Sequence, residues 1–211
     1  MRSPASQLDS RRRRRKIRAV PADLVLASAS PRRRELLRWL GVQFRVDAVD
    51  VDERPRAGEA ADAIVHRLAR TKAEAGAARA PGSWILAADT LVELDGAVLG
   101  KPRDRDDAVS MLTRLSGREH RVYTGFALRD PAAVVRAARV VTSRVRFRSL
   151  GRATIEAYAS CGEPDDKAGA YALQGRGAGL VAEVVGSFTN VIGLPLVEVE
   201  AALTEAGVLA R

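Results

Sequence analysis

Residues 24–37 read LVLASASPRRRELL, a stretch that predicts a short buried strand running directly into a helix. Ser30 followed by Pro31 has the form of a helix N-cap with proline at the first helical position, where its missing N–H group is not needed. Three arginines occupy the first helical turn, although that end of a helix favours anions over cations. A bound phosphate would remove this conflict, because serine hydroxyls, helix N–H groups and guanidinium groups would then converge on one anion. The stretch therefore predicts an anion site at a strand-to-helix turn.

Helical geometry separates the three arginines. At roughly 100° per residue, Arg33 falls on the side of the apolar stripe, Arg32 flanks it and Arg34 points away. We therefore expect Arg32 and Arg33 to face a ligand, with Ser28 and Ser30 as phosphate donors. The alternative is an ordinary helix start with a basic surface turn, which a single short motif does not exclude.

Composition limits the class of protein. A chain of 211 residues with 46% hydrophobic and 29% charged residues is typical of one soluble globular domain, which we place at 22–211. We expect no membrane span and no secretory signal, because no apolar run has the required length. With a single cysteine, Cys161, no intrachain disulfide can form, and a cytoplasmic location is expected. Two histidines make a histidine-rich metal site or a serine-histidine-aspartate triad improbable.

The net charge of +9 is unevenly distributed. Residues 1–21 carry eight basic residues against one acidic residue, which accounts for +7 and leaves the remainder nearly neutral. We interpret 1–21 as a disordered, solvated basic tail, because no apolar or aromatic residues are interleaved to form a stacking surface. Binding to nucleic acid is therefore not expected, apart from weak, salt-dependent contacts through this tail.

Polar residues follow three predicted elements at positions where they can meet. A strand at 44–49 ends in the acidic turn 50–53, whose carboxylates suit a divalent cation, although a plain polar loop remains the alternative. Lys72 continues the apolar stripe of a helix at 59–80, either to snorkel or to reach an anion. Asp89 follows an apolar strand at 84–88, which predicts a place at the carboxyl end of the sheet, unless it is only a turn or cap residue.

The remaining pattern indicates a mixed α/β fold. A hairpin at 91–99 turns at Asp95-Gly96 and returns Lys101 towards the level of Asp89. A helix at 104–115, strands at 120–128 and 138–148 and a short helix at 154–161 lead to a glycine-rich segment at 162–179. That segment matches neither common phosphate-binding glycine pattern. Strand-like runs at 180–185 and 191–194 precede a last helix at 195–206, so strands and helices alternate and a sheet covered by helices is expected.

A close resemblance to the Maf family of nucleoside triphosphate pyrophosphatases is carried, in order along the chain, by LASASPRRRELL (26–37), VDE (51–53), AADT (87–90), GKP (100–102), LSG (115–117), EP (163–164), DKAGAY (166–171), QG (174–175) and VIGLPL (191–196). The resemblance covers about 23–209 and omits only the basic tail. It implies an elongated mixed β-sheet flanked by helices, with two lobes and a central cleft, as in inosine triphosphatase-like folds. It also implies a homodimer and metal-dependent hydrolysis of a nucleotide to a monophosphate and pyrophosphate.

The resemblance also assigns roles to single residues. Asp89 matches the family's catalytic proton acceptor, while Glu53, Lys72 and Lys101 match its other polar active-site residues. Three positions distinguish subgroups. Arg32, Thr90 and Gln174 match the dTTP/UTP type, whereas the 7-methyl-GTP type tends to have Trp, Gln and Glu at these positions. Ala172 stands where the family usually has glycine, close to the expected base pocket.

The chemistry of such a reaction agrees with the residues present. Cleavage between the α- and β-phosphates requires positive charge on a polyanion, hard oxygen ligands for Mg²⁺ or Mn²⁺, and an oriented water. Arg32, Arg33, Lys72 and Lys101 can supply the first, Glu53 and Asp89 the second, and Asp89 the third.

We also consider two other functions. A regulator of cell division, a septum formation inhibitor, would act through a protein or DNA partner, as the family's older name implies. An inosine triphosphate pyrophosphatase would prefer purines, which the residues at positions 32, 90 and 174 disfavour.

Overall fold

The computed structural model of the protein describes residues 23–210. The basic segment 1–21, expected to be a disordered tail, lies outside the described residues. The helices and strands, in chain order, are β1 (Leu24–Leu26), α1 (Pro31–Trp39), β2 (Arg45–Val46), α2 (Ala61–Arg79), β3 (Trp84–Leu94), β4 (Ala97–Leu99), α3 (Arg105–Leu115), β5 (Glu119–Arg129), β6 (Val135–Phe147), α4 (Arg152–Ala159), the 3₁₀ turns η1 (Ala168–Ala170) and η2 (Gly175–Leu180), β7 (Val181–Val185), α5 (Phe188–Ile192) and α6 (Leu196–Glu205).

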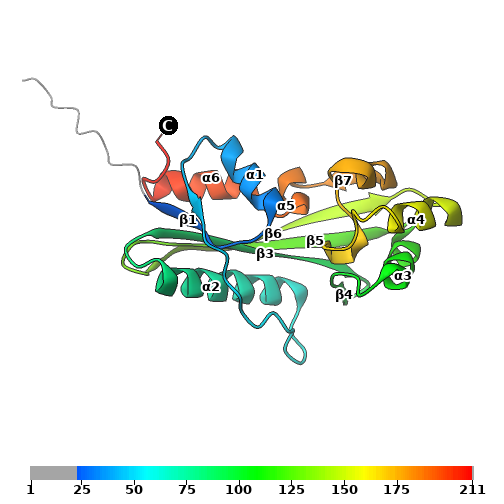
Figure 1. Ribbon diagram of the computed structural model, residues 1–211, viewed down its shortest axis with the longest axis horizontal. Coiled ribbons are helices and arrows are strands. Elements are labelled where there is room, and N and C mark those ends of the chain that lie inside the picture. Colours follow the sequence, from blue (N-terminus) through cyan, green and yellow to red (C-terminus); the bar gives the residue numbers. More distant parts are fainter. Residues whose placement is uncertain (1–22, 211) are drawn as a thin grey trace, which may run out of the picture.

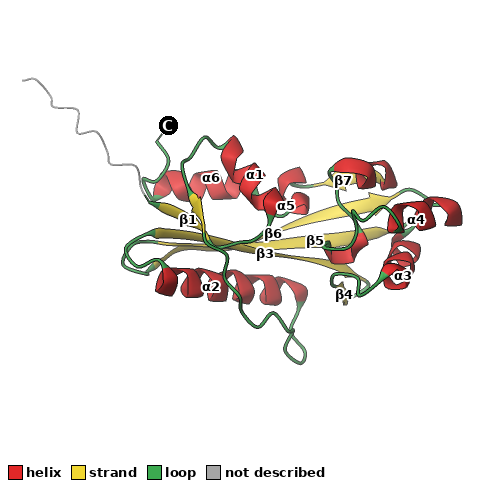
Figure 2. Cartoon of the chain, in the orientation of Figure 1, coloured by secondary structure: helices red, strands yellow, loops and turns green. Residues whose placement is uncertain are grey.

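One mixed sheet of seven strands forms the frame of the molecule. Its order is β2-β1-β3-β5-β6-β7, with β4 paired to the far part of β3. β1 is parallel to β2 and β3, and the other pairs are antiparallel. Figure 1 shows an elongated molecule in which α1, α5 and α6 cover one face of the sheet, α2 covers the other, and α3 and α4 lie at the far end. Figure 2 shows the same arrangement of a sheet between helices, which confirms the expected mixed α/β fold.

The apolar side chains of the sheet pack in three separate clusters. In β1, Leu24 and Leu26 face the cluster under α1 and α6, while Val25, and Ala27 just after the strand, face α2, as expected for the alternation of a strand. A third cluster, built on β4, α3 and α4, contains Val92 of β3. β3 and β5 therefore contribute to the cores of both ends of the molecule, and the expected two lobes share one continuous sheet.

The local signals at helix ends and turns are confirmed. Ser30 caps α1 by accepting a hydrogen bond from the Arg33 N–H, and Pro31 begins the helix. Asp104 caps α3 through the Asp107 N–H. The β3–β4 hairpin turns at Asp95 and Gly96, with φ values of 52° and 77°, as a primed two-residue turn requires.

Three sequence predictions are wrong. The strand expected at 44–49 is reduced to Arg45–Val46. The strand-like run at 191–194 instead lies in α5 and the turn that follows it, where Ser187 supplies the helix cap. The strand expected to stop at Ala88 continues to Leu94, so Asp89 lies inside β3 rather than after it. The apolar run had suggested a short strand, but pairing with β5 carries β3 onward through its polar residues.

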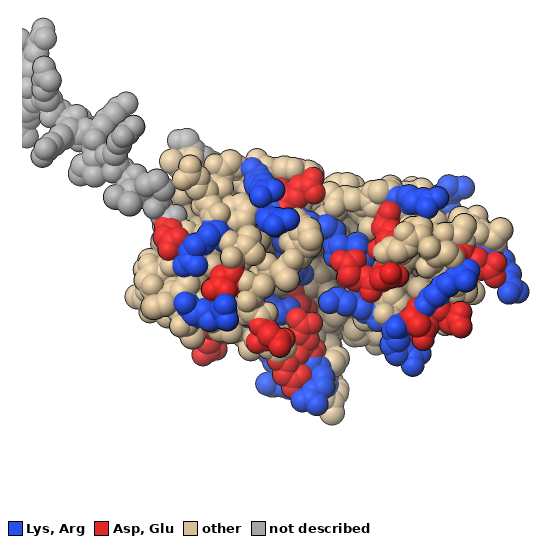
Figure 3. All heavy atoms as spheres, viewed as in Figure 1, with Lys and Arg blue, Asp and Glu red and all other residues tan. Residues whose placement is uncertain are grey.

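In the described residues 23–210, no helix is long and apolar enough to cross a membrane. Figure 3 shows basic and acidic side chains interspersed over the visible face rather than separated by sign. Several arginines of β6 illustrate this pairing, since Arg139, Arg144 and Arg146 each contact a glutamate.

Candidate active site

The site forms where one edge of β3 is left open. β1 pairs with β3 only as far as Leu86, and β4 begins to pair with it at Val92. Between these points Asp89 and Thr90 pair with β5 on one edge only. Because neighbouring residues of a strand point to opposite faces, Asp89 faces α2 and Thr90 faces α1. A cavity that wraps around this open edge can therefore use both side chains.

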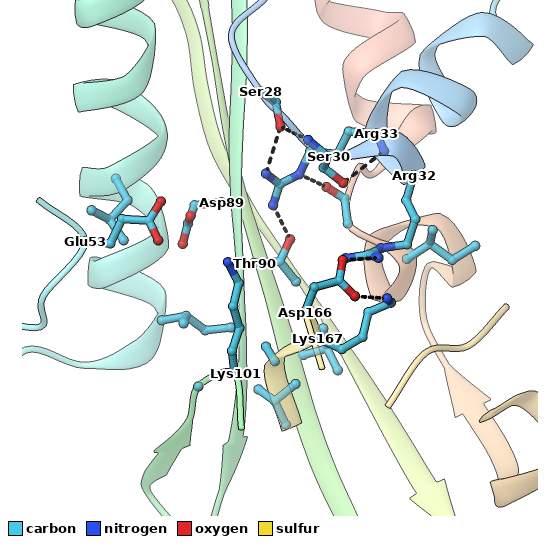
Figure 4. A pocket seen from close by; sticks show the side chains of 18 of the residues that line it. Ser28, Ser30, Arg32, Arg33, Glu53, Asp89, Thr90, Lys101, Asp166 and Lys167 are labelled. Carbon is cyan, nitrogen blue, oxygen red and sulfur yellow. Dashed lines mark hydrogen bonds and ion pairs between the residues drawn. The ribbon is translucent and has the colours of Figure 1, made fainter. Parts of the chain in front are cut away.

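A cavity of about 620 Å³ lies at this edge and between the two lobes. The following residues, all singled out from the sequence, line it: Ser28, Ser30, Arg32, Arg33, Glu53, Lys72, Asp89, Thr90, Lys101 and Gln174. The structure thus brings every predicted site residue to one cavity. Figure 4 shows the serine-arginine turn on one side of β3, and Glu53 with Asp89 on the other.

Lys72 joins the two acidic residues of the cavity. Its Nζ lies 2.6 Å from Oδ1 of Asp89 and 2.5 Å from Oε1 of Glu53. The side chains of Lys72 and Asp89 are each only 9% exposed, whereas that of Glu53 is half-exposed. The inward position of Lys72 on α2 is therefore explained by a buried ion pair, which keeps Asp89 close to a positive charge.

Neighbouring cations set the charge of Glu53. Burial alone would raise the pKa of Glu53, but the hydrogen bond and charge of Lys72, with smaller effects of Lys101 and Arg33, hold that pKa below its usual value. Glu53 therefore carries a negative charge at neutral pH.

The acidic turn 50–53 does not act as a unit. Asp52 forms a salt bridge with Arg54 at 2.7 Å on the surface, and of the turn's carboxylates only Glu53 lines the cavity. Among residues 23–210 there is no cluster of three or more His, Cys, Asp or Glu side chains placed to hold a metal ion. Of the acidic turn, Glu53 is therefore the carboxylate that faces the cavity, because Asp52 pairs with Arg54 on the surface.

The serine-arginine turn has the geometry of an anion site. Ser28 Oγ accepts the Ser30 N–H at 3.2 Å, and Ser30 Oγ accepts the Arg33 N–H at 3.4 Å. These contacts use the lone pairs of the hydroxyl oxygens, which leaves the hydroxyl protons for donation to an anion. The N-terminus of the nine-residue α1 adds its positive partial charge at the same place.

Arg33 lines the cavity and donates hydrogen bonds to three of its neighbours. Its Nε donates to the Gly193 carbonyl at 2.8 Å, Nη1 to Ser28 Oγ at 3.3 Å and Nη2 to Thr90 Oγ1 at 3.0 Å. Burial lowers the pKa of Arg33, while attraction to Asp89 opposes this effect. Arg33 therefore ties three segments together as well as placing positive charge at the cavity.

Thr90 is held on its other side by β5. Thr124 Oγ1 donates to the Asn190 carbonyl at 2.9 Å, so it can only accept in its 2.9 Å hydrogen bond with Thr90. Thr90 thus accepts from Arg33 and donates to Thr124. This order fixes the hydroxyl group of Thr90 between α1 and β5.

Asp166 and Lys167 also line the cavity, although the sequence pattern assigns them no role. Arg32 Nη1 donates to Asp166 Oδ2 at 3.2 Å, and Lys167 pairs with the other oxygen of the same carboxylate (Figure 4). Arg32 belongs to α1 and Asp166 to the loop before η1, so the pair bridges the two lobes. The run of charges at 165–167 beside a proline was the available signal, but a charged loop is usually only a solvated surface.

The donor set fits a divalent cation that also contacts phosphate. Glu53 and Asp89 converge on one ammonium group, so their carboxylates lie close together. Mg²⁺ is usually bound through one or two carboxylates, waters and substrate phosphates rather than through a complete protein cage. Glu53 and Asp89, in the same cavity as the serine-arginine turn, match this type of coordination.

Comparison with known proteins agrees with this geometry. The model of the family described as Maf-like protein matches residues 23–206. The chain belongs to this family. A dTTP/UTP pyrophosphatase of Myxococcus xanthus is 59% identical over 184 residues, which cover 87% of this chain and 92% of the relative. A dTTP/UTP pyrophosphatase of Methylococcus capsulatus is 50% identical over 192 residues, covering 90% and 94% of the two chains.

A solved structure supports the fold of this Maf-like chain. The Staphylococcus aureus Ham1 protein superposes with a TM-score of 0.51 at 14% identity, covering 88% of this chain and 99% of that one. At this identity the likeness concerns the fold alone, and it agrees with the elongated sheet expected from the sequence.

Proposed function

We propose that this chain is a nucleoside triphosphate pyrophosphatase that hydrolyses dTTP and UTP to the monophosphate and pyrophosphate. One observation supports this proposal above all. The serine-arginine turn and Asp89, which is paired with Lys72, line the same cavity at the open edge of β3. The relatives named dTTP/UTP pyrophosphatase support the substrate. Arg32, Thr90 and Gln174, which line the same cavity, match the residues of the dTTP/UTP subgroup.

Asp89 is the proposed catalytic base. It takes a proton from a water molecule whose oxygen attacks the α-phosphorus, while the bond to the β-phosphate breaks and pyrophosphate leaves. Lys72 holds the carboxylate in place through the 2.6 Å ion pair. Ser28, Ser30 and Arg32 bind and orient the phosphates, with Lys101 at the rim of the same cavity.

We propose Mg²⁺ or Mn²⁺ as the cofactor, with Glu53 and Asp89 as its protein ligands. When bound, the ion supplies positive charge that stabilises the phosphates during bond cleavage. The proximity of both carboxylates to Lys72 Nζ supports this assignment. Chelation with excess EDTA is expected to abolish turnover, and added Mg²⁺ or Mn²⁺ to restore it; full activity in EDTA would contradict the cofactor proposal.

The substrate is tested with a nucleotide panel. Purified full-length protein is incubated with Mg²⁺ or Mn²⁺ and each of the common ribo- and deoxynucleoside triphosphates, and products are separated by ion-exchange chromatography. Monophosphate and pyrophosphate are expected from dTTP and UTP in preference to the purine nucleotides. The absence of dTMP and UMP would refute the substrate assignment.

The role of Asp89 is tested with Asp89→Asn, which keeps the shape of the side chain and removes its basicity. General-base catalysis contributes about 10²–10⁴-fold, so kcat is expected to fall by at least about 100-fold. Circular dichroism should show an unchanged fold. An Asn variant with more than about a tenth of the wild-type kcat would exclude Asp89 as the base.

We also propose that the enzyme acts in the cytoplasm as a homodimer. A single cysteine, Cys161, suits a reducing compartment. Light scattering coupled to size-exclusion chromatography tests the dimer, and a mass near 22.7 kDa would contradict it.

A further inference from the structure

The segment 172–177 brings Gln174 to the cavity, and the structure shows how that segment is held. Leu173 and Gln174 both line the cavity, and the chain then turns into η2. Gln174 itself is half-buried and has a non-helical conformation at the start of this turn. Its position therefore depends on the backbone on either side of it.

Glu163 fixes the backbone that follows Gln174. Its Oε2 accepts the Arg176 N–H at 2.9 Å, and its Oε1 accepts the Gly177 N–H at 2.9 Å. Burial alone raises the pKa of Glu163, but these two N–H groups, Tyr158 and Lys167 hold the pKa below its usual value. A charged carboxylate thus receives two main-chain donors, which is a strong form of hydrogen bonding.

Tyr158 fixes the backbone that precedes Gln174. Its hydroxyl donates to Glu163 Oε1 at 2.8 Å and accepts the Ala172 N–H at 3.1 Å. The ring of Tyr158 packs in the core of the second lobe and is only 5% exposed. One tyrosine-glutamate pair therefore holds both ends of 172–177.

Two glycines make this arrangement tight. A Cβ on Gly177 would lie 2.2 Å from the Ala172 carbonyl oxygen and 2.5 Å from the Tyr158 hydroxyl oxygen. A Cβ on Gly175, where φ is +77°, would lie 2.7 Å from Glu163 Oε2. The segment can approach the pair this closely because it lacks side chains at these two positions.

We propose that Glu163 and Tyr158 are positioning residues for recognition of the nucleobase. Neither belongs to the cavity lining, so they act through 172–177, whose held backbone sets the place from which the Gln174 side chain extends. That amide offers an acceptor and donors, as the imide edge of thymine or uracil requires. The proposal rests on the proposed function, and it adds that selection of the base depends on a buried pair remote from the phosphates.

The test measures discrimination between bases. Glu163→Gln keeps the size of the side chain but turns an amide NH₂ group towards one of the main-chain donors. The ratio of kcat/KM for dTTP to kcat/KM for dGTP is expected to fall about tenfold, mainly through KM for dTTP. Because a loss of folded protein lowers both values equally, this ratio does not respond to a merely structural defect.

A matched control and a second variant accompany this measurement. Glu156→Gln makes the same change on the exposed side of α4, where Glu156 pairs with Arg152, and should leave the ratio unchanged. Tyr158→Phe removes only the hydroxyl group and should lower the ratio in the same direction. If Glu163→Gln does not fold, Tyr158→Phe carries the test alone.

A double variant decides whether the effect passes through Gln174. In a Gln174→Ala background, Glu163→Gln should lower the ratio by less than about twofold further, because the amide that it positions is gone. An unchanged ratio in both Glu163→Gln and Tyr158→Phe, or a full additional loss in the double variant, would overturn the proposal. The wild-type panel judges the proposed function separately, since the ratio can be measured for any pair of nucleotides that the wild type distinguishes.

Discussion

Lys72 decides the electrostatics of the site at the scale of single residues. Its ammonium group contacts Glu53 and Asp89 together, and both carboxylates are proposed to share a cation. The lysine and the proposed divalent ion would therefore compete for the same oxygens. Lys72 would thus affect both the binding of the metal and the position of the Asp89 carboxylate.

Lys72→Met tests this link because it retains the apolar stem and removes the charge. Turnover of dTTP is expected to fall about 100-fold, since Asp89 loses the group that orients it. Affinity for Mn²⁺ without nucleotide, measured by isothermal titration calorimetry, is expected to rise, because one competing cation is gone. Arg70→Met, on the exposed side of the same helix, is the control. Unchanged or weaker Mn²⁺ binding in Lys72→Met would refute the competition.

Residue types that break a local rule were the ones predictable from sequence. Arginines at a helix start and a lysine on an apolar stripe both conflict with their surroundings, and both lie at the cavity. Glu163 and Tyr158 break no rule, since each is an ordinary side chain whose partners are main-chain N–H groups 14 or fewer residues away. Their role could not be predicted because side-chain to main-chain contacts across 13 or 14 residues, unlike helix caps, leave no pattern in residue type.

At the scale of elements, the placement of α2 on the sheet depends on a glycine of β5. A Cβ on Gly125 would lie 2.3 Å from the Val65 carbonyl oxygen and 3.0 Å from the His66 nitrogen. The backbone of α2 thus lies directly on the strand, and this approach sets how far Lys72 reaches towards Asp89. A glycine inside a strand pattern is a known signal of close backbone approach.

Gly125→Ala is therefore expected to destabilise the protein strongly. Helix backbone cannot move aside as a flexible side chain can, so unfolding free energy should fall by about 3 kcal/mol, the upper end of overpacking effects. Turnover should fall as well, because Lys72 moves with α2. Gly151→Ala, where an added Cβ meets nothing within 4 Å, serves as the control. Urea denaturation measures both, and equal stability of the two variants would contradict the argument.

Helix ends and turns could be predicted where a few adjacent residues decide them. The extent of a strand could not be predicted where it depends on pairing with a strand remote in sequence. The Ser30 cap, the Asp104 cap and the Asp95-Gly96 turn each depend on a few adjacent residues, and all three are confirmed. The extent of β3 depends on β5, which pairs with it as far as Glu93 and is remote in sequence. For that reason the sequence predicts Asp89 after a strand, although the residue lies within β3.

At the scale of the whole molecule, one buried histidine makes stability depend on pH. His120 is 2% exposed, its Nε2 lies 2.8 Å from the Tyr171 hydroxyl, and its Nδ1 has no hydrogen-bond partner in the part of the chain that the structure describes. Burial lowers the pKa of His120 from 6.5 to about 4. The folded state therefore holds His120 neutral where the unfolded chain would protonate it.

The sign of the effect follows from proton binding. Between about pH 6.5 and pH 4 the unfolded state binds the extra proton, so stability is complete above this window and falls as pH falls through it, by about 3 kcal/mol in total. His120→Gln, which keeps a polar partner for Tyr171, should reduce this loss, whereas His66→Gln should retain it. Urea denaturation at several pH values measures how the free energy of unfolding changes with pH. An equal change in the two variants would count against His120.

The wide sequence separation of the residues that line the cavity has a consequence for synthesis of the protein. The residues that line the cavity run from Ala27 to Gly193 in the sequence, and Arg33 Nε has its carbonyl acceptor only when Gly193 is present. Contacts of such long sequence separation form slowly and late. A chain emerging from the ribosome therefore has no complete site until Gly193 has been synthesised, and a nucleotide bound at this site can stabilise only a chain that includes this residue.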